Sequence, residues 1–195
     1  MFVKNTAEDS LERRLSLFHQ RPLEYERIYR FCPYVIAEAG VNHEGSLAVA
    51  KRQIEEAKTA GANAIKFQSY KAETLAAKSA PSYWDTTQEI ADNQYDLFRR
   101  YDHFGPDDYQ SLKAHCDRVG ILFLSTPFDA EAVEYLAPLV PVFKIASADI
   151  TNRPLIEQIG KKRKPIILST GASTVGEIRQ ALSWLTRYNV SVVLL

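Results

Sequence analysis

From residue 34 onward the chain alternates short apolar segments with amphipathic segments of helical period. The apolar segments are rich in β-branched and aromatic residues and lack the two-residue alternation of a half-exposed strand. This composition is typical of parallel strands buried on both faces. Six such segments occur, at 34–38, 63–68, 121–126, 142–147, 165–170 and 191–195. Their alternation with helices predicts a parallel sheet with right-handed crossovers.

The amphipathic segments carry residues that are typical of helix ends. Ser46 is suited to cap a helix that stops at Gly61, because a serine oxygen accepts from the first free amides and glycine adopts the conformation that ends a helix. The segment 106–120 begins with proline and ends with glycine, the common order at helix termini. Thr174 and Glu177 have the spacing of a capping box.

Polar residues close nearly every predicted strand, which favours a closed barrel over an open sheet. A (β/α)₈ TIM barrel gathers the carboxyl ends of its strands around one active-site mouth, whereas an open sheet spreads them along a line. The glycine-rich fingerprint of a dinucleotide-binding sheet does not follow the first strand. The polar strand-end residues are Glu38, Lys66, Gln68, Ser125, Thr126, Lys144, Ser147, Ser169 and Thr170.

The chain has fewer predicted strands than the eight of a complete barrel. A complete one takes about 250 residues, and six strand segments can be counted here. We therefore expect 34–195 to be a partial barrel domain of about six βα units, without the last two strands. Residues 1–33 form a separate segment, in which Leu11, Leu15 and Phe18 recur at helical spacing and predict a helical extension.

The stretch 69–105 is a long insertion after the second strand and is rich in tyrosine, tryptophan and phenylalanine. Insertions of this length commonly have a function, and this one leaves a strand at its carboxyl end. We interpret it as a lid or a substrate-binding loop.

Charge and cysteine content limit the classes of binding partner and the cellular compartment that the sequence supports. The 24 basic residues balance the 24 acidic residues, which gives no support for nucleic acid or an anionic membrane as a partner. The sequence shows no signal peptide and no segment of membrane-spanning length. Cys32 and Cys116 lie far apart and are interpreted as reduced thiols. These features predict a cytoplasmic protein.

Lys66 and Lys144 are the most informative candidate site residues, because each lies inside an otherwise apolar strand where an unpaired ammonium is costly. Each could instead pair with a carboxylate such as Glu38, or extend its amine to solvent. Two lysines at the ends of different strands suit a ligand with two anionic groups.

Hydroxyl groups near these lysines have two possible roles. Ser147, Ser169 and Thr126 could cap the following turns, or could form a phosphate cradle beside the lysines. Asn42 and His43 lie in the first loop after a strand, where a single histidine is as a rule a surface hydrogen-bonding residue. The sequence contains no histidine or cysteine cluster that specifies a complete metal site.

Five motifs in one order carry a family resemblance: AEAGVNHEGS (37–46), AGANAIKFQ (60–68), GILFLSTPFD (120–129), FKIASADITNRPLI (143–156) and KPIILSTGAS (164–173). From Tyr34 to Leu195 the chain resembles the N-acetylneuraminate (sialic acid) synthase family. The resemblance implies a TIM barrel that condenses phosphoenolpyruvate with an N-acylated amino sugar similar to N-acetylmannosamine. Phosphate is released, and the product is a nonulosonic acid of surface carbohydrate biosynthesis.

The resemblance also implies roles for individual residues. Glu38 would act near the reacting carbons as the catalytic carboxylate, and Gln68 would lie near the sugar, with Asn42 and His43 in the loop that borders this site. Two residues would hold the carboxylate of phosphoenolpyruvate, Lys66 and Thr126. Three residues would bind its phosphate, Lys144, Ser147 and Ser169.

The family also uses a divalent metal, Mn²⁺ or Mg²⁺, which polarises the aldehyde of the sugar. Its two metal-binding histidines, and a C-terminal antifreeze-like domain that closes the active site of a partner in a homodimer, lie beyond the part that this chain matches. We therefore expect no metal ligand within the chain, a homodimer for a full-length protein, and no activity from these 195 residues alone.

Two other interpretations stay open. A lysine at a barrel mouth can form a Schiff base, so an aldolase or lyase using Lys66 or Lys144 is possible. A catalytically inactive truncated barrel or a binding module is the non-enzymatic alternative.

Overall fold

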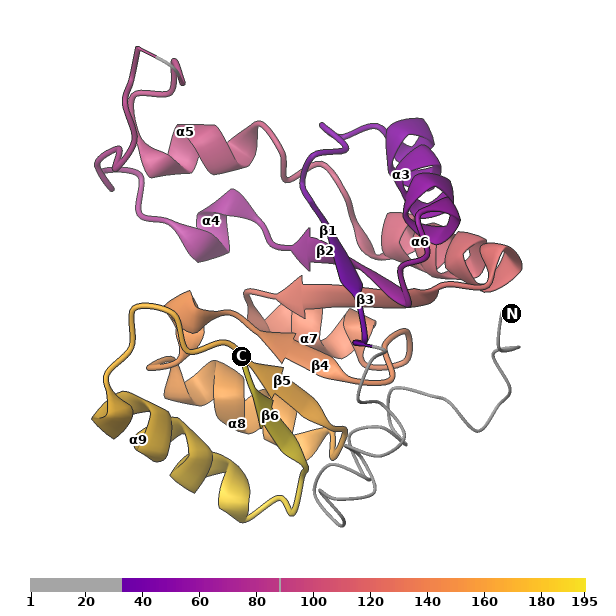
Figure 1. Cartoon of the computed structure of the whole chain (residues 1–195). Coiled ribbons are helices and arrows are strands. Elements are labelled where there is room, and N and C mark those ends of the chain that lie inside the picture. The colour runs from indigo at the N-terminus through magenta and orange to yellow at the C-terminus, as the bar shows by residue number, and fades with distance from the viewer. Residues whose placement is uncertain (1–32, 88) are drawn as a thin grey trace. The chain divides into compact units, whose positions relative to one another are not determined.

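The computed structural model describes residues 33–87 and 89–195 (Figure 1). The helical extension predicted for 1–33 and the thiol of Cys32 therefore fall almost wholly outside the described residues. The described chain divides into two compact units, Ile36–Val140 and a second unit built mainly from Pro141–Leu195. Each unit is a small parallel α/β structure and is treated separately below.

The first unit contains a parallel sheet in the order β1-β2-β3, formed by Ile36–Gly40, Ala64–Ser69 and Leu122–Pro127. Register pairs Glu38 with Lys66, and Gln68 with Thr126. Because residues paired in a parallel register point to the same face, these four polar side chains belong to one face of the sheet. The opposite face carries Phe67 and Phe123, which are buried.

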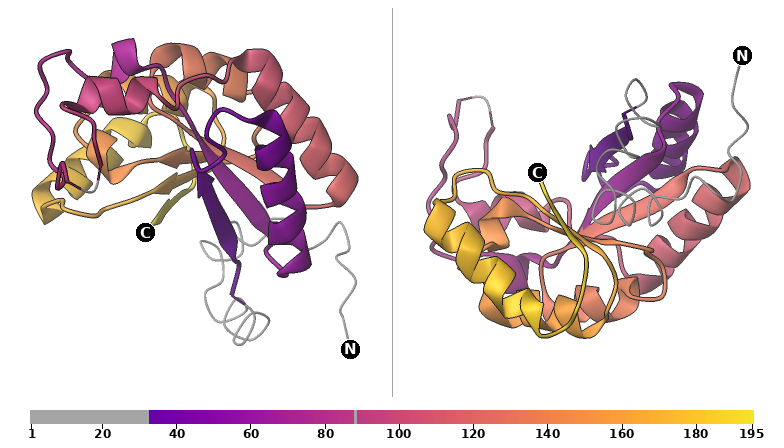
Figure 2. Two further views of the ribbon diagram at one scale, coloured as in Figure 1. Left: turned by 90° about the horizontal axis from the view of Figure 1, so that it is seen from above. Right: turned by 60° about the horizontal axis from the view of Figure 1, so that its bottom comes forward.

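Three helices pack on the sheet of this unit: α3 (Leu47–Thr59), α6 (Pro106–Val119) and α7 (Ala130–Leu136). Figure 2 shows α3 and α6 side by side on the sheet. Ser46 caps α3 by accepting from the amide of Val49, and Gly120 ends α6 in the left-handed conformation, at φ 77°. Both predicted helix ends are thereby confirmed.

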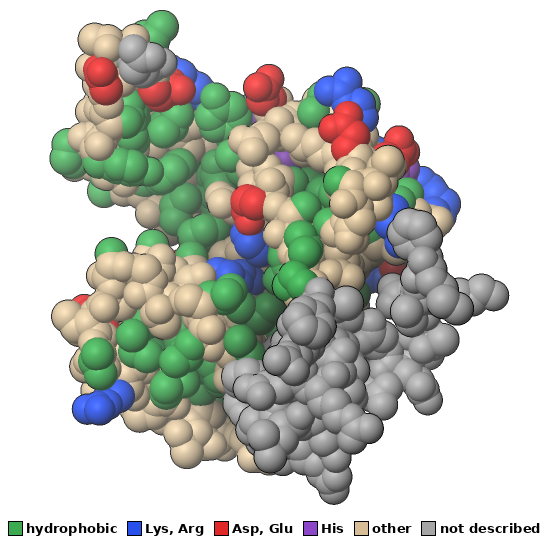
Figure 3. All heavy atoms as spheres, in the orientation of Figure 1, with side chains coloured by type: hydrophobic (Ala, Val, Ile, Leu, Met, Phe, Trp, Pro, Cys, Tyr) green, Lys and Arg blue, Asp and Glu red, His purple; other side chains and the backbone are tan. Residues whose placement is uncertain are grey.

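The aromatic insertion carries two short helices, α4 (Ala72–Leu75) and α5 (Gln94–Arg99). Between them the chain is irregular, with one antiparallel bridge between Pro81 and Asn93. Figure 3 shows hydrophobic side chains gathered over this part of the surface, at its upper left. Tyr83 and Ile90 are 75% and 81% exposed. The role of the insertion as a lid stays a prediction.

The second unit contains a parallel sheet in the order β4-β5-β6, formed by Phe143–Ile145, Ile166–Leu168 and Val192–Leu194. A short 3₁₀ helix, η2 (Ser147–Asp149), follows β4, and α8 (Arg153–Lys161) and α9 (Val175–Thr186) pack against each other. Thr174 and Glu177 form the predicted capping box of α9.

All six predicted strands are present and every pair is parallel, which confirms the α/β class and the strand–helix alternation. The described residues form two three-stranded sheets and no closed barrel. The partial-barrel architecture of 34–195 therefore stays a prediction. Within the described part of the chain, no helix combines the length and the apolarity that crossing a membrane requires.

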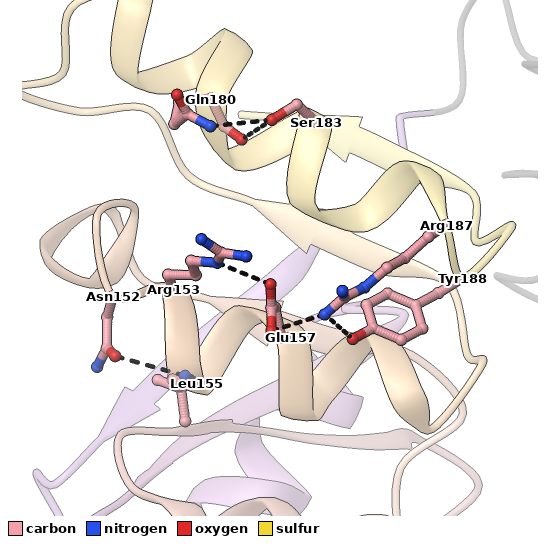
Figure 4. A network of polar contacts seen from close by, with 8 residues as sticks. All are labelled: Asn152, Arg153, Leu155, Glu157, Gln180, Ser183, Arg187 and Tyr188. Carbon is pink, nitrogen blue, oxygen red and sulfur yellow. Dashed lines mark hydrogen bonds and ion pairs between the residues drawn. The ribbon is translucent and has the colours of Figure 1, made fainter.

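Glu157 on α8 joins this helix to the end of α9 (Figure 4). Its carboxylate accepts from Arg153 at 2.8 Å and from Arg187 at 2.6 Å. The hydrogen bond from Arg153 holds the pKa of Glu157 below its usual value. Arg187 in turn donates to the hydroxyl of Tyr188 at 2.7 Å. The Tyr188 ring is thereby held against α8.

Replacing Gly160 of α8 by alanine is expected to destabilise this unit. A Cβ there would lie 2.4 Å from Cδ2 and 3.0 Å from Cγ of Tyr188, so the ring must move away from the helix. Such overpacking costs about 1–3 kcal/mol. At Gly176 of α9 a Cβ meets its nearest atom at 3.7 Å, so Gly176→Ala should change the free energy of unfolding by less than about 0.5 kcal/mol. Urea unfolding of both variants measures the difference, and an equal effect would contradict this account.

Candidate active-site residues

Lys66 forms an ion pair with Glu38 on the neighbouring strand. The two residues are register partners, and Nζ of Lys66 lies 2.5 Å from Oε2 of Glu38. The Lys66 side chain is 13% exposed and that of Glu38 is 49% exposed. The ammonium group of Lys66 is thus paired with a carboxylate inside an apolar strand. A polar ligand can reach the ion pair from the side of Glu38, which is half-exposed.

Gln68 and Thr126 lie next to this pair on the same face of the sheet. Nε2 of Gln68 is 3.5 Å from Oε1 of Glu38, a contact at the long limit of a hydrogen bond. The hydroxyl of Thr126 is buried and has no hydrogen-bond partner among the described residues. A buried hydroxyl without a partner is unusual, so the site offers a ligand a polar group that the protein leaves unsatisfied.

In the loop after β1, the neighbours Asn42 and His43 differ in exposure. Asn42 is exposed, whereas His43 is 1% exposed, stacked on Phe104 with ring centroids 4.0 Å apart. Nδ1 of His43 accepts from the amide of Gly45 at 3.1 Å. Burial lowers the pKa of His43 to about 4. A direct contact between this ring and a sugar would need the loop to open, so its role as a sugar ligand stays a prediction.

Lys144 and Ser169 meet in the second unit. Nζ of Lys144 donates to Oγ of Ser169 at 2.6 Å and to the carbonyl of Ile145 at 3.0 Å. Ser147 begins η2, and its Oγ would lie 3.4 Å from a Cβ placed on Gly171. The missing side chain at Gly171 therefore lets the loop after β5 approach Ser147. All three residues predicted to bind phosphate come from neighbouring strand ends of one unit.

A pocket of about 340 Å³ adjoins these residues. It is lined by side chains of η2 and of the loop that leads into α9, including Ser147, Thr151 and Ser173. The carboxylate of Glu177 also lines it and already accepts from the amide of Thr174. Because Glu177 occupies the first turn of α9, a bound anion would rely on Lys144 and the serine hydroxyls rather than on this helix terminus.

Asp149 is a site candidate that the sequence motifs did not single out. It ends η2, and its Oδ1 accepts from Nδ2 of Asn152 at 3.1 Å, while its Oδ2 is buried with no partner among the described residues. Burial raises the pKa of Asp149 above its usual value. It lies within the motif 143–156, two residues after Ser147, but a single aspartate in a turn is as a rule solvated.

The described residues do not bring together three histidine, cysteine or carboxylate groups that could hold a metal. The unsatisfied oxygen of Asp149 is a single donor and does not make a complete site. Burial raises the pKa of the Cys116 thiol to about 12, which disfavours the reactive thiolate at neutral pH. The candidate residues of the first unit offer one ammonium group, a buried hydroxyl and an accessible carboxylate, and those of the second unit offer one ammonium group and two serine hydroxyls.

Comparison with known proteins shows the family to which the chain belongs. The family model described as the NeuB family matches residues 53–195. The N,N'-diacetyllegionaminic acid synthase of Campylobacter jejuni is 43% identical over 157 residues, which are 78% of this chain and 46% of that protein. The human N-acetylneuraminate-9-phosphate synthase is 36% identical over 148 residues, 75% of this chain and 41% of that protein.

A solved structure is similar in fold as well as in sequence. The N-acetylneuraminic acid (sialic acid) synthetase from Leptospira borgpetersenii serovar Hardjo-bovis superposes with a TM-score of 0.72 at 34% identity, covering 83% of this chain and 52% of that chain. The chain thus spans about half the length of the proteins that it matches, or less. Because the family model covers most of the sequence and the relatives exceed 30% identity over three quarters of it, the chain belongs to the NeuB family.

Proposed function

We propose that this chain carries the phosphoenolpyruvate-binding part of a nonulosonic acid synthase. The observation that carries the proposal is that each unit has one lysine in an apolar strand near a hydroxyl group. Lys66 shares a sheet face with Thr126, and Lys144 donates to Ser169. A doubly anionic substrate needs such groups for its two charged ends. The names of the relatives, which are synthases of sialic-type acids, support the same chemistry.

In this proposal Lys144, Ser147 and Ser169 bind the phosphate of phosphoenolpyruvate, while Lys66 and Thr126 bind its carboxylate. The hydrogen bond between Lys144 and Ser169 holds the ammonium at the strand ends before any ligand arrives. Such preorganised donors lower the cost of binding an anion, because the protein need not rearrange. The same proposal assigns Gln68, Asn42 and His43 to the sugar side of Glu38.

The proposed reaction forms a bond between C3 of phosphoenolpyruvate and the aldehyde carbon of the open-chain amino sugar. The C2–C3 and carbonyl double bonds become single bonds, so the former aldehyde oxygen takes up a proton and C2 becomes electron-deficient. Water then adds at C2, and the bond between C2 and the phosphate oxygen breaks to release phosphate. Glu38 orients this water and takes its proton, for which its half-exposed carboxylate beside Lys66 is suited. The lysines stabilise the charge on the departing phosphate and on the carboxylate.

The residues described here do not make a complete site for the divalent metal that the resemblance implies. We propose that the ligands of this ion lie in the part of the family's proteins that this chain does not match. We also propose that this chain alone binds phosphoenolpyruvate without converting it to product. Release of phosphate by the chain, dependent on both phosphoenolpyruvate and N-acetylmannosamine, would contradict that proposal.

The Schiff-base alternative has less support from the site. A Schiff base forms from a neutral amine, whereas Lys66 lies in an ion pair and Lys144 donates to two oxygens. Borohydride treatment with pyruvate or an aldehyde sugar should therefore leave the chain unmodified in a mass spectrum. A borohydride-trapped adduct on either lysine would favour the aldolase or lyase instead.

Titration calorimetry with phosphoenolpyruvate tests the proposed function. The chain should bind phosphoenolpyruvate more tightly than either phosphate or pyruvate, because each of these ligands carries only one of the two anionic ends. Equal affinity for all three ligands, or no binding of phosphoenolpyruvate, would contradict the proposal.

A further inference from the structure

The two ends of the aromatic insertion are tied together by polar contacts. Nζ of Lys71, which directly precedes α4, donates to the carbonyl of Asp102 at 2.6 Å and to that of Phe104 at 3.0 Å. The amide of Ala72 donates to Oδ2 of Asp102 at 2.9 Å. Lysine ammonium groups in proteins mostly face solvent or a carboxylate, so one that binds two backbone carbonyls is a specific structural device.

These contacts fix the position of the segment 102–104, which in turn packs on the loop after β1. Phe104 is 4% exposed and stacks on His43 with an interplanar angle of 4°. Its neighbour His103 lies so close to Gly45 that a Cβ there would be 2.6 Å from Cδ2 of the imidazole. The loop that follows Glu38 therefore has the tied end of the insertion as its packing partner.

His43 is the loop residue that Phe104 stacks on. Its Nδ1 accepts from the amide of Gly45, which has φ 75°, so the ring also holds the loop's own turn. Because Nδ1 is an acceptor, the proton of the neutral ring is on Nε2. The stack of Phe104 on His43 and the hydrogen bond to Gly45 thus belong to one packed unit, and displacing Phe104 would release both.

We propose that Lys71 is a positioning residue for the loop that follows Glu38: by binding the carbonyls of Asp102 and Phe104 it seats Phe104 on His43 and so fixes the approach to the proposed sugar side of the site. This inference rests on the proposed function only for the identity of the ligand. The geometry of the anchor is independent of it. Lys71 touches no proposed substrate atom and acts through Phe104 and His43.

The test is Lys71→Met, which keeps the aliphatic chain and removes all three donors. Two carbonyls then lose a charge-assisted hydrogen bond, and the Gly45 amide should exchange with deuterium at least about tenfold faster. In a proton NMR titration the pKa of His43 should rise by about one unit or more toward its value in an unfolded chain. Lys71→Arg, which keeps the donors, should restore both values.

Lys58→Met is the matched control. Lys58 also donates from Nζ to one backbone carbonyl, that of Gly120 at 2.6 Å. Gly120 lies just before the start of β3, whereas Lys71 follows the carboxyl end of β2, so the two contacts lie at opposite ends of the strands. The control variant should leave His43 and Gly45 unchanged. Should Lys71→Met fail to fold, Phe104→Leu removes the stacking ring while leaving Lys71 in place, and should raise the pKa of His43 by itself.

Unchanged His43 titration and unchanged Gly45 exchange in folded Lys71→Met would overturn the inference, as would an equal change in Lys58→Met. In the second variant, an unchanged His43 titration in Phe104→Leu would do the same. None of these measurements needs a substrate. Absence of phosphoenolpyruvate binding by the unmodified chain would instead overturn the proposed function and leave the anchor standing.

Discussion

Unfolding of the chain in urea is expected to require about 2–3 kcal/mol less free energy at pH 4.5 than at pH 7.5 on account of His43 alone. Burial lowers the pKa of this histidine to about 4 in the folded chain, from an ordinary value of 6.5. The neutral ring is therefore the form that the folded state favours. Its contribution is fully present above pH 6.5 and is lost as the pH falls toward 4.

The physical cause is desolvation. The ring is 1% exposed between Phe104 and Phe67, where water cannot stabilise an imidazolium. The carboxylate of Asp108 opposes the shift and the nearby His103 adds to it. Protonation would also place a proton on Nδ1, which now accepts from Gly45, so the charged form loses that hydrogen bond.

His43→Asn is the control that isolates this residue. The asparagine oxygen can still accept from Gly45, but the side chain no longer titrates. Both proteins carry the same carboxylates, so the comparison isolates the contribution of the imidazole. The variant should therefore lose about 2–3 kcal/mol less than the parent between the two pH values. An identical pH dependence in parent and variant would contradict the burial of a neutral histidine.

Lys144→Met is expected to weaken the binding of phosphoenolpyruvate by about 10- to 150-fold. Charge-assisted hydrogen bonds contribute about 1.5–3 kcal/mol each, and methionine preserves the packing of the aliphatic chain while removing the ammonium. Ser169 would also lose the donor that now lies 2.6 Å from its hydroxyl. Calorimetry of parent and variant measures the loss.

Lys113→Met is suited as its control. Lys113 is a surface lysine of α6 that pairs with Asp117 one turn later, at 2.6 Å. Removing it lowers the net charge of the chain by the same amount as Lys144→Met. Its affinity for phosphoenolpyruvate should match that of the parent, and an equal loss in both variants would mean that only overall charge, and no local site, governs binding.

Much of the fold follows from local sequence. Ser46, Gly120 and the pair Thr174–Glu177 end their helices as predicted, because capping depends on neighbours within one turn. The apolar runs predict the strands in the right places, but the fourth, fifth and sixth strands are shorter than their runs. Ser147 begins a 3₁₀ helix instead of ending β4, because a hydrophobic run does not specify where backbone pairing stops.

The ion pair of Lys66 with Glu38 was one of the alternatives that the sequence left open. The sequence alone could not select this alternative, because the ion pair depends on the strand register that places the two residues opposite each other. The anchor at Lys71 was not predicted at all. It joins positions about thirty residues apart through backbone carbonyls, which leave no trace in residue type or periodicity.

The burial of His43 also could not be predicted from local sequence. Its place in a polar loop predicted exposure, and the structure buries it because Phe104 and Phe67 cover the ring from segments distant in sequence. The unsatisfied oxygen of Asp149 was equally out of reach, since burial of a turn residue depends on what packs over it.

The binding of inorganic phosphate by Lys144→Met and Lys66→Met tests the central claim most directly. Phosphate carries only one of the two charged ends of phosphoenolpyruvate, so the assignment predicts a marked loss of phosphate affinity in Lys144→Met and an unchanged affinity in Lys66→Met. Phosphoenolpyruvate affinity should fall in both. Loss of phosphate binding in Lys66→Met, or its full retention in Lys144→Met, would contradict the account.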